Sequence, residues 1–310
     1  MTIIAKTELD VFPLNLGGNV FGWTADEATS FTVLDAYAEA GGNFIDTADS
    51  YGRGEDGSRG GRSEEIIGRW LAARGNRDRI VVATKVARMP GFEGLSASNI
   101  ATAAENSLRR LGVDHIDLYY AHFDDPDVPL EETLGAFNEL VTAGKVRYLA
   151  ASNLSPQRVA ESLAVSRREG FAEYVALQPH YNLVEREFES TYVPLLEREG
   201  MQALPYFALA KGFLTGKYRD RNARVEGPRA QGSLAYLDDR GERVLAALDR
   251  VAAAHETSVP AVALAWLAAQ PTVVAPIASA RTVEQLNGLL PMADLKLTAE
   301  ELDDLTTASN

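Results

Sequence analysis

The sequence predicts a single α/β domain, residues 1–310, in the form of a closed (β/α)8 barrel with helices around it. Three observations favour this fold. Short apolar runs of strand type alternate with longer amphipathic helical patterns along most of the chain, which is typical of a parallel α/β sheet. The runs number eight, as such a barrel requires, and no repeat, low-complexity tract or linker divides the 310 residues. A chain of this length could also hold two smaller domains, so the alternation decides in favour of one barrel.

The candidate strands are apolar runs of four to seven residues, and the amphipathic helical patterns lie between or after them. The strands are Leu14–Asn19, Asn43–Asp46, Ile80–Val86, Ile116–His122, Val146–Ser152, Tyr174–Pro179, Gln202–Tyr206 and Val273–Ile277. The helices are Ala25–Ala40, Ser63–Arg74, Ser98–Leu111, Leu130–Ala143, Pro156–Arg168, Phe188–Glu199 and Thr282–Leu290. Two departures from strict alternation precede the last strand: an irregular stretch, Phe207–Tyr236, and two extra helices, Asp239–His255 and Val259–Ala269. A loop as long as the first is usually functional.

Several helix boundaries carry their own signals. Ser63 followed by Glu64 and Glu65 predicts a capped helix start, and Ser155 before Pro156 predicts a second one. Glycines that directly follow helical patterns predict helix ends at Gly112, Gly144 and Gly170.

Composition limits the classes of partner. The formal net charge of −14 argues against a nucleic-acid or anionic-membrane surface, because such binding needs clustered Lys and Arg. The chain has no Cys, which excludes disulfides, thiolate nucleophiles and sulfur metal sites, and we expect no metal centre. Residues 1–10 lack a signal-peptide pattern, and the longest apolar run, near Ala261–Ala269, is too short to span a membrane. We therefore expect a cytoplasmic protein with a small-molecule partner.

Polar residues fall where a barrel of this type places its active site, at the carboxyl ends of the strands. Asp46 ends the second candidate strand, Lys85 lies near the end of the third, and His122 ends the fourth. Tyr51 follows Asp46 by five residues and opens the segment 52–62, whose Gly, Arg and acidic residues are typical of a surface loop. Taken singly, the acid could close a turn, the lysine could reach solvent, and the imidazole could serve only as a structural hydrogen-bonder.

Together these four residues form a plausible proton-transfer site. A tyrosine has an ordinary pKa of about 10, so its use as a proton donor and acceptor near neutral pH requires a nearby cation that stabilises the phenolate. Lys85 held by Asp46 would supply that cation, and a lysine flanked by strand residues is costly to bury unless it is paired.

At this point the chain resembles the aldo-keto reductases over nearly its whole length. The matching stretches are 43–48 with 51–52, 83–85, 120–122 through 125–126, 151–153, 177–178 and 210–218. The resemblance implies a TIM barrel that uses NADPH to reduce an aldehyde or ketone to the alcohol. It also implies a catalytic tetrad in which Tyr51 is the general acid, Lys85 paired with Asp46 assists it, and His122 orients the carbonyl.

The resemblance also implies contacts to NADPH. Ser152, Asn153 and Gln178 match hydrogen-bonders to the nicotinamide carboxamide, and Tyr206 matches the aromatic residue on which the ring stacks. The stretch 209–217 resembles a loop that covers the pyrophosphate; its candidate contacts are Leu209, Lys211, Gly212 and Lys217.

The adenosine end is predicted at the turn after the last strand. Thr282 and Gln285 have capping-box spacing, and a barrel's phosphate site commonly lies near its last two strands. Arg281 is therefore the candidate for the 2′-phosphate of NADPH, with Gln285 beside it. The chain departs from the family pattern where Gly288 and Leu289 replace the usual Glu and Asn that contact adenine.

Three aromatic residues in loops after the strands, Trp23, Phe92 and Phe123, are candidates for the walls of a pocket for an apolar carbonyl substrate. Two other functions are open. A nucleotide-binding regulatory subunit of a potassium channel uses the same fold with little turnover, and a barrel hydrolase would need paired carboxylates where this chain has one acid beside a Lys and a His.

Overall fold

The computed structural model describes residues 1–52, 59–220 and 230–310. Its central feature is an eight-stranded sheet in which every pairing between neighbouring strands is parallel, in the order β11-β10-β9-β8-β5-β4-β3-β12. The strands are β3 (Asn15–Gly17), β4 (Phe44–Asp46), β5 (Val81–Val86), β8 (Ile116–Ala121), β9 (Val146–Ser152), β10 (Tyr174–Gln178), β11 (Gln202–Ala203) and β12 (Ile277–Ala278). The predicted parallel α/β fold is confirmed, and each of the eight predicted strands contains or overlaps one of these.

Backbone hydrogen bonds join the two ends of the sheet. The Ala203 N–H donates to the Thr272 carbonyl at 2.8 Å, and the Val274 N–H donates to the Ala203 carbonyl at 3.0 Å. A third bond runs from the Ile277 N–H to the Pro205 carbonyl at 2.8 Å. The first half of the predicted eighth strand, Val273–Ile277, therefore pairs with β11. Regular strand geometry begins only at Ile277, where β12 pairs with β3.

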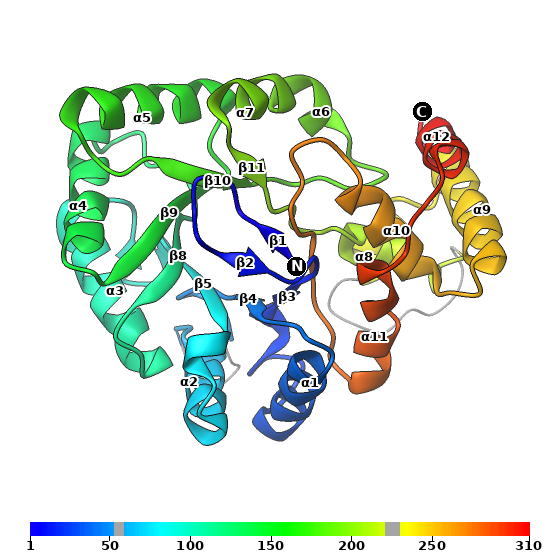
Figure 1. Cartoon of the computed structure of the whole chain (residues 1–310), viewed down its shortest axis with the longest axis horizontal. Coiled ribbons are helices and arrows are strands. Elements are labelled where there is room, and N and C mark those ends of the chain that lie inside the picture. Colours follow the sequence, from blue (N-terminus) through cyan, green and yellow to red (C-terminus); the bar gives the residue numbers. More distant parts are fainter. Residues whose placement is uncertain (53–58, 221–229) are drawn as a thin grey trace.

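The helices surround the sheet (Figure 1). Those that follow successive strands are α1 (Glu27–Glu39), α2 (Arg62–Arg74), α3 (Ala97–Leu111), α4 (Leu130–Thr142), α5 (Pro156–Glu169), α6 (Glu187–Thr191), α7 (Val193–Glu199) and α11 (Val283–Asn287). The extra helices are α8 (Ala230–Leu234), α9 (Asp239–Ala254), α10 (Val259–Ala268) and α12 (Ala299–Ala308). Short 3-10 helices are η1 (Gly18–Val20), η2 (Arg77–Arg79), η3 (Ala210–Thr215) and η4 (Leu290–Ala293).

Alternation along the strands separates two cores. Side chains that face into the barrel, such as Phe44, Leu118 and Ala176, form one buried cluster. Side chains that face outward, such as Val82 and Leu149, pack with the helices in a larger cluster. A hairpin formed by β1 (Thr2–Ile3) and β2 (Asp10–Val11) lies across one end of the barrel (Figure 1).

Several boundaries differ from the sequence prediction. Ser63 is not a helix cap: α2 begins at Arg62 after Gly61, and the Ser63 hydroxyl is buried and donates to the Gly18 carbonyl. The predicted helix Phe188–Glu199 is two helices, α6 and α7, that meet at Tyr192. The predicted helix Thr282–Leu290 ends earlier, because α11 stops at Asn287.

Other elements were missed. The hairpin of β6 (Arg88–Met89) and β7 (Phe92–Glu93) follows β5, and α12 closes the chain. The irregular stretch 207–236 contains η3 and α8, while its residues 221–229 lie outside the described part of the chain, as do residues 53–58 of the predicted surface loop. The predicted cap at Ser155 is confirmed. The predicted helix ends at Gly112, Gly144 and Gly170 are also confirmed, and each of these glycines has a positive φ.

Within the described residues no single helix combines the length and hydropathy needed to cross a membrane, although α9 and α10 meet both criteria as a pair bent by 99°.

Candidate active site

Five predicted site residues come from consecutive strands of the sheet and meet at its carboxyl edge. Asp46 ends β4, Lys85 lies in β5, and His122 directly follows β8. Ser152 ends β9 and Gln178 ends β10. Because parallel strands in register present their ends at one edge, the order of these strands brings the side chains together.

Lys85 and Asp46 form a buried ion pair. The Lys85 ammonium is fully buried and donates to Asp46 Oδ2 at 2.6 Å and to the Thr47 carbonyl at 2.7 Å. Burial alone would lower the pKa of Lys85, but the charges of Asp46 and Tyr51 outweigh it, so the pKa lies above its ordinary value. Gln178 Nε2 donates to the other Asp46 oxygen at 2.8 Å. The ammonium is therefore charged at neutral pH and is fixed in position.

Tyr51 lies over this ammonium. Its phenol oxygen is 3.5 Å from Lys85 Nζ, and the ammonium is 5.0 Å from the centre of the ring. The turn that carries Tyr51 is closed by a hydrogen bond from its N–H to the Ala48 carbonyl at 3.1 Å. The Tyr51 and His122 rings meet edge to face with centroids 6.2 Å apart. A phenol, a cation and an imidazole thus border one space.

His122 is held in its neutral form. Burial, followed by the charges of Lys85 and Arg88, lowers the pKa of His122 well below its ordinary value. Its backbone N–H donates to the Val86 carbonyl at 3.1 Å, which continues the pairing of β8 with β5. Among the described residues its Nδ1 atom is buried without a hydrogen-bond partner. A neutral imidazole has one N–H to donate, so this side chain can bind an oxygen without adding a charge.

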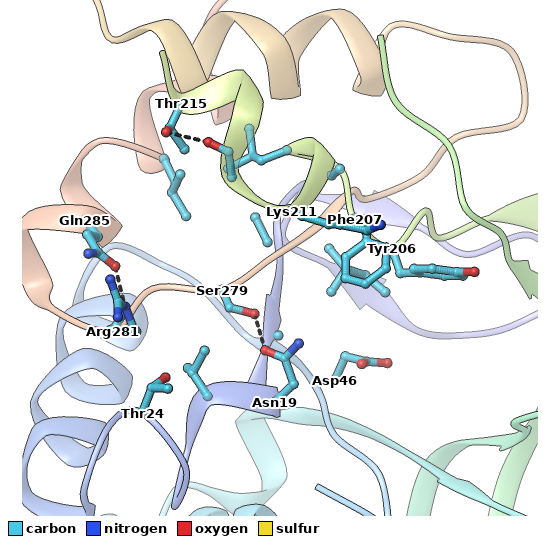
Figure 2. A pocket seen from close by; sticks show the side chains of 18 of the residues that line it. Asn19, Thr24, Asp46, Tyr206, Phe207, Lys211, Thr215, Ser279, Arg281 and Gln285 are labelled. Atoms are coloured by element: carbon cyan, nitrogen blue, oxygen red, sulfur yellow. Dashed lines mark hydrogen bonds between the residues drawn. The ribbon is translucent and has the colours of Figure 1, made fainter. Parts of the chain in front are cut away.

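These groups open into a cavity of 820 Å³, which lies within the size range of small-molecule and cofactor sites. Asp46, Tyr51 and His122 line it, whereas Lys85 is buried behind them. Figure 2 shows Tyr206 and Asp46 on one side of the pocket and Arg281 on the other. The predicted catalytic residue Asp46 and the Arg281 guanidinium therefore lie on opposite sides of the cavity.

A chain of hydrogen bonds links the polar residues that were predicted to bind the nicotinamide. Ser152 Oγ donates to the Gln178 carbonyl, Asn153 Nδ2 donates to Ser152 Oγ, and the Tyr206 hydroxyl donates to Asn153 Oδ1, each at 2.9 Å. Asn153 also donates to the His122 carbonyl at 3.0 Å and has a left-handed backbone with φ of 56°. All four predicted residues of this group, Ser152, Asn153, Gln178 and Tyr206, line the cavity.

The predicted pyrophosphate loop wraps along the same cavity. Its four candidate residues, Leu209, Lys211, Gly212 and Lys217, all line the wall. Lys211 and Gly212 have positive φ values of 58° and 104°, which bend the chain sharply inside η3. From α8, Ser233 Oγ donates to the Lys211 carbonyl at 2.7 Å and holds this bend. A hydrogen bond from α8 therefore supports the bend of a loop that lines the cavity.

At the far end, Arg281 precedes α11. Thr282 caps this helix by accepting from the Gln285 N–H at 3.2 Å, as predicted. The Gln285 side chain accepts from the Arg281 N–H at 3.0 Å, where a capping box would place that bond on the Thr282 N–H. Arg281, Gln285 and the acidic Glu284 all line the cavity.

Ser279 and Asn19 are among the polar residues of the cavity wall that the sequence prediction missed. Ser279 Oγ donates to Asn19 Oδ1 at 2.8 Å across the middle of the pocket (Figure 2), and both residues line it. They come from opposite ends of the chain and meet only because β12 pairs with β3. Their positions in the sequence could have indicated them, because Asn19 ends the first predicted strand and Ser279 follows the last one.

The aromatic candidates divide. Trp23 and Phe123 line the cavity, and 47% of the Trp23 surface is exposed. Phe92 lies in the β6–β7 hairpin, and it is not among the described residues that line the cavity. Its backbone carbonyl accepts from Asn99 Nδ2 at 2.8 Å, so its segment is tied to α3. The described cavity wall thus includes two of the three aromatic candidates, and Phe92 as a pocket wall stays a prediction.

Comparison with known proteins gives a consistent answer. A family model described as the aldo/keto reductase family matches residues 13–310. Norsolorinic acid reductase A of Aspergillus parasiticus is 33% identical over 96% of this chain and 78% of its own length. The NADP(+) aryl-alcohol dehydrogenase of Phanerodontia chrysosporium is 33% identical over 96% and 82%, and the aldo-keto reductase YhdN of Bacillus subtilis is 33% identical over 99% and 92%.

Proposed function

The chain belongs to the aldo/keto reductase family of oxidoreductases, and we propose that it reduces an aldehyde or ketone to the alcohol with NADPH, using Tyr51 as the proton donor. The family and the reductase names of its relatives support carbonyl reduction in general. The single observation that carries the finer proposal is the Lys85 ammonium, which is paired with Asp46 at 2.6 Å and reaches the Tyr51 phenol at 3.5 Å.

Tyr51 donates its proton to the carbonyl oxygen as that oxygen gains negative charge. The phenolate that remains is stabilised by the fixed positive charge of Lys85, which burial keeps from being screened by solvent. Asp46 has two roles: it keeps Lys85 charged, and with Gln178 it fixes where the ammonium lies. The oxidation of an alcohol would run the same proton transfer in reverse.

His122 orients the substrate oxygen. Its low pKa keeps the imidazole neutral, so its N–H can bind the carbonyl oxygen without donating a proton in competition with Tyr51. The edge-to-face contact between the two rings fixes their relative positions. A carbonyl oxygen held by both residues is thereby aligned with its proton donor.

The residues of the cavity fit NADPH. The Ser152–Asn153–Gln178 group offers amide and hydroxyl partners for a carboxamide, and the Tyr206 ring offers a face for the nicotinamide. The bend at Lys211 and Gly212, with Lys217, offers backbone and cationic partners for the pyrophosphate. Arg281 offers a bidentate guanidinium for the 2′-phosphate. When bound, the nicotinamide supplies the hydride that reaches the carbonyl carbon.

A direct test is NADPH consumption by the purified protein across a panel of aliphatic and aromatic aldehydes and ketones. We expect turnover that depends on both the carbonyl compound and the cofactor. Tight NADPH binding without turnover on any member of the panel would contradict the proposal and favour a nucleotide-binding regulatory protein. The matched control is heat-denatured protein, which should give no consumption above the background.

A further inference from the structure

Phe123 follows His122 directly, and its ring contacts both an arginine and this histidine. The Arg88 guanidinium lies 4.2 Å from the centre of the Phe123 ring. His122 lies 5.1 Å from the same ring, at an interplanar angle of 40°. Phe123 itself lines the cavity beside His122 and Tyr51. A substrate whose carbonyl oxygen is bound by those two residues therefore meets a phenyl ring that is already fixed on another side by a cation.

Arg88 contacts this ring from a neighbouring hairpin. Among the described residues it is not part of the cavity wall, and it lies in β6, where its Cα is paired with that of Glu93 in β7. Glu93 Oε2 accepts from the Gly91 N–H at 2.8 Å and so closes the turn of the hairpin. The charge of Arg88 is nevertheless felt at the site, since it is one of the causes that lower the pKa of His122.

A second aromatic side chain lines the same cavity. Trp23 has 47% of its surface exposed. An indole of this size gains free energy when a ligand covers it, and aromatic pairs gain further from offset or edge contacts. Two aromatic side chains therefore line the cavity, and one of them, Phe123, contacts a guanidinium that is not among the described residues of the cavity wall.

We propose that this site prefers aryl carbonyl compounds with electron-rich rings, and that the Arg88–Phe123 pair sets this preference. A cation on one face of a ring is attracted by the negative potential of its π-system. The same cation offsets that negative potential on the opposite face, which then attracts rings whose own faces are more negative, as in hydroxy- and methoxy-substituted aryl groups. Nitro-substituted rings are disfavoured for the same reason. Arg88 and Phe123 are thus specificity-determining residues.

This inference rests on the proposed function, because it places the substrate carbonyl at Tyr51 and His122. Its test compares 4-methoxybenzaldehyde with 4-nitrobenzaldehyde, in the native protein and in Arg88→Met. The intrinsic reactivity of the two aldehydes cancels when the ratio of their kcat/KM values is compared between the two proteins. We expect the methoxy-to-nitro ratio to be about threefold higher in the native protein, the effect of one exposed cation–π contact.

Two further variants sharpen the test. In a Phe123→Leu background, Arg88→Met should leave the ratio unchanged, because the ring that transmits the charge is gone. The matched control is Arg74→Met, which removes an arginine that lies 5.8 Å from the Phe31 ring on the helical layer; it should not alter the ratio. The proposal would be overturned if the methoxy-to-nitro ratio of kcat/KM were the same in the native protein and in Arg88→Met, as it would be if the variant lost activity equally on both aldehydes.

Binding of unreactive analogues separates this inference from the proposed function. With NADP+ present, 4-methoxybenzamide should bind more tightly relative to 4-nitrobenzamide in the native protein than in Arg88→Met, again by about threefold. If no aldehyde is turned over but this difference in dissociation constants is found, the proposed function is wrong and the aromatic preference stands. If aldehydes are turned over and the difference is absent, the preference is wrong.

Discussion

Lys85 shows how one side chain can be identified from sequence while its surroundings cannot. A lysine among strand residues is costly to bury without a partner, so the residue pattern alone indicates a paired cation. The partner Asp46 is predicted from its own strand end. The Thr47 carbonyl, at 2.7 Å from the ammonium, is not, because a backbone acceptor leaves no mark in the residue types.

The sequence prediction also did not identify Asp49, two residues before Tyr51, as a buried carboxylate. It is buried, and neither carboxylate oxygen has a hydrogen-bond partner among the described residues. Burial, followed by the charge of Glu64, raises the pKa of Asp49 to about 7. Glu64 is itself buried and is paired with Arg110 at 2.6 Å and with Thr84. Buried polar groups of this kind destabilise a fold unless they become neutral.

This gives a prediction at the scale of the residue: Asp49→Asn stabilises the protein at pH 8 but not at pH 4. The pKa of Asp49 is raised from 3.8 to about 7 in the folded protein. Between these two pH values the folded protein keeps a proton on Asp49 that the unfolded chain has lost, so the stability of the native protein falls as pH rises from 3.8 to about 7. Above pH 7 the shift corresponds to at most about 4 kcal/mol. Denaturant melts at both values of pH measure it. The exposed Asp303→Asn is the control, and a gain of equal size at pH 4 would rule out this account.

At the scale of the element, α11 was predicted in the right place and with the right cap but with the wrong end. The cap follows from Thr282 and Gln285, which are adjacent on the helix. The end does not, because Gly288 has an ordinary right-handed conformation, with φ of −73°, and the chain continues into η4 through Leu289. The length of a short helix depends on packing, which residue types alone do not specify.

Arg281→Ala should weaken NADPH binding far more than NADH binding. Only NADPH carries the 2′-phosphate, and charge-assisted bonds from a guanidinium are worth roughly 1.5–3 kcal/mol, or about 10- to 150-fold in the dissociation constant. Fluorescence titration with both cofactors measures the two losses. Lys296→Ala removes a positive charge outside the described cavity wall and is the control. Equal losses for NADPH and NADH would show that Arg281 does not bind the phosphate.

Gly288 and Leu289 replace the Glu and Asn of the family pattern, and putting these polar residues back should have different effects at the two positions. Gly288 lines the cavity in an ordinary right-handed conformation, so Gly288→Glu can add a hydrogen bond and tighten NADPH by about 0.5–1.5 kcal/mol. The new Cβ would lie 3.3 Å from the Gln285 carbonyl, which must shift by a few tenths of an ångström to admit it. Leu289 also lines the cavity, but only 4% of its surface is exposed and it packs in the core, so Leu289→Asn should destabilise the fold by about 2 kcal/mol or more. Dissociation constants and thermal melts of each single variant check both. A harmless Leu289→Asn would contradict the packing described for η4.

At the scale of the whole molecule, the barrel could be predicted because its signal is repeated. Eight apolar runs, each followed by a helical pattern or a long connection, constrain one another, and the order of the sheet follows from them. Elements outside that repeat were missed. The hairpins β1–β2 and β6–β7 have two-residue strands, too short for an alternating pattern. The helix α12 had a usable signal in the capping box of Thr298 and Glu301.

The two ends of the barrel should separate stability from function. Ile4, beside the β1–β2 hairpin, is fully buried in the interior cluster, whereas Ile3 is 60% exposed. The hairpin lies at the amino ends of the strands, since its Asp10 carbonyl accepts from Asn43 just before β4. We expect Ile4→Ala to lower the free energy of unfolding by about 2–5 kcal/mol and Ile3→Ala to change it by less than about 0.5 kcal/mol. Both should keep the kcat/KM of the native protein in the folded state. A large loss of kcat/KM in Ile4→Ala would show that the hairpin end is coupled to the site.

The most direct test of the central claim is the turnover number of Tyr51→Phe with NADPH and an aldehyde that the native protein reduces. This change removes only the hydroxyl that lies 3.5 Å from Lys85 Nζ, and the ring can keep its contact with His122. Loss of a positioned general acid costs about 100- to 10,000-fold, so we expect kcat to fall at least 100-fold while the NADPH dissociation constant stays within about twofold of the native value. A kcat within tenfold of the native value, with the same cofactor affinity, would contradict the assignment of Tyr51 as the proton donor.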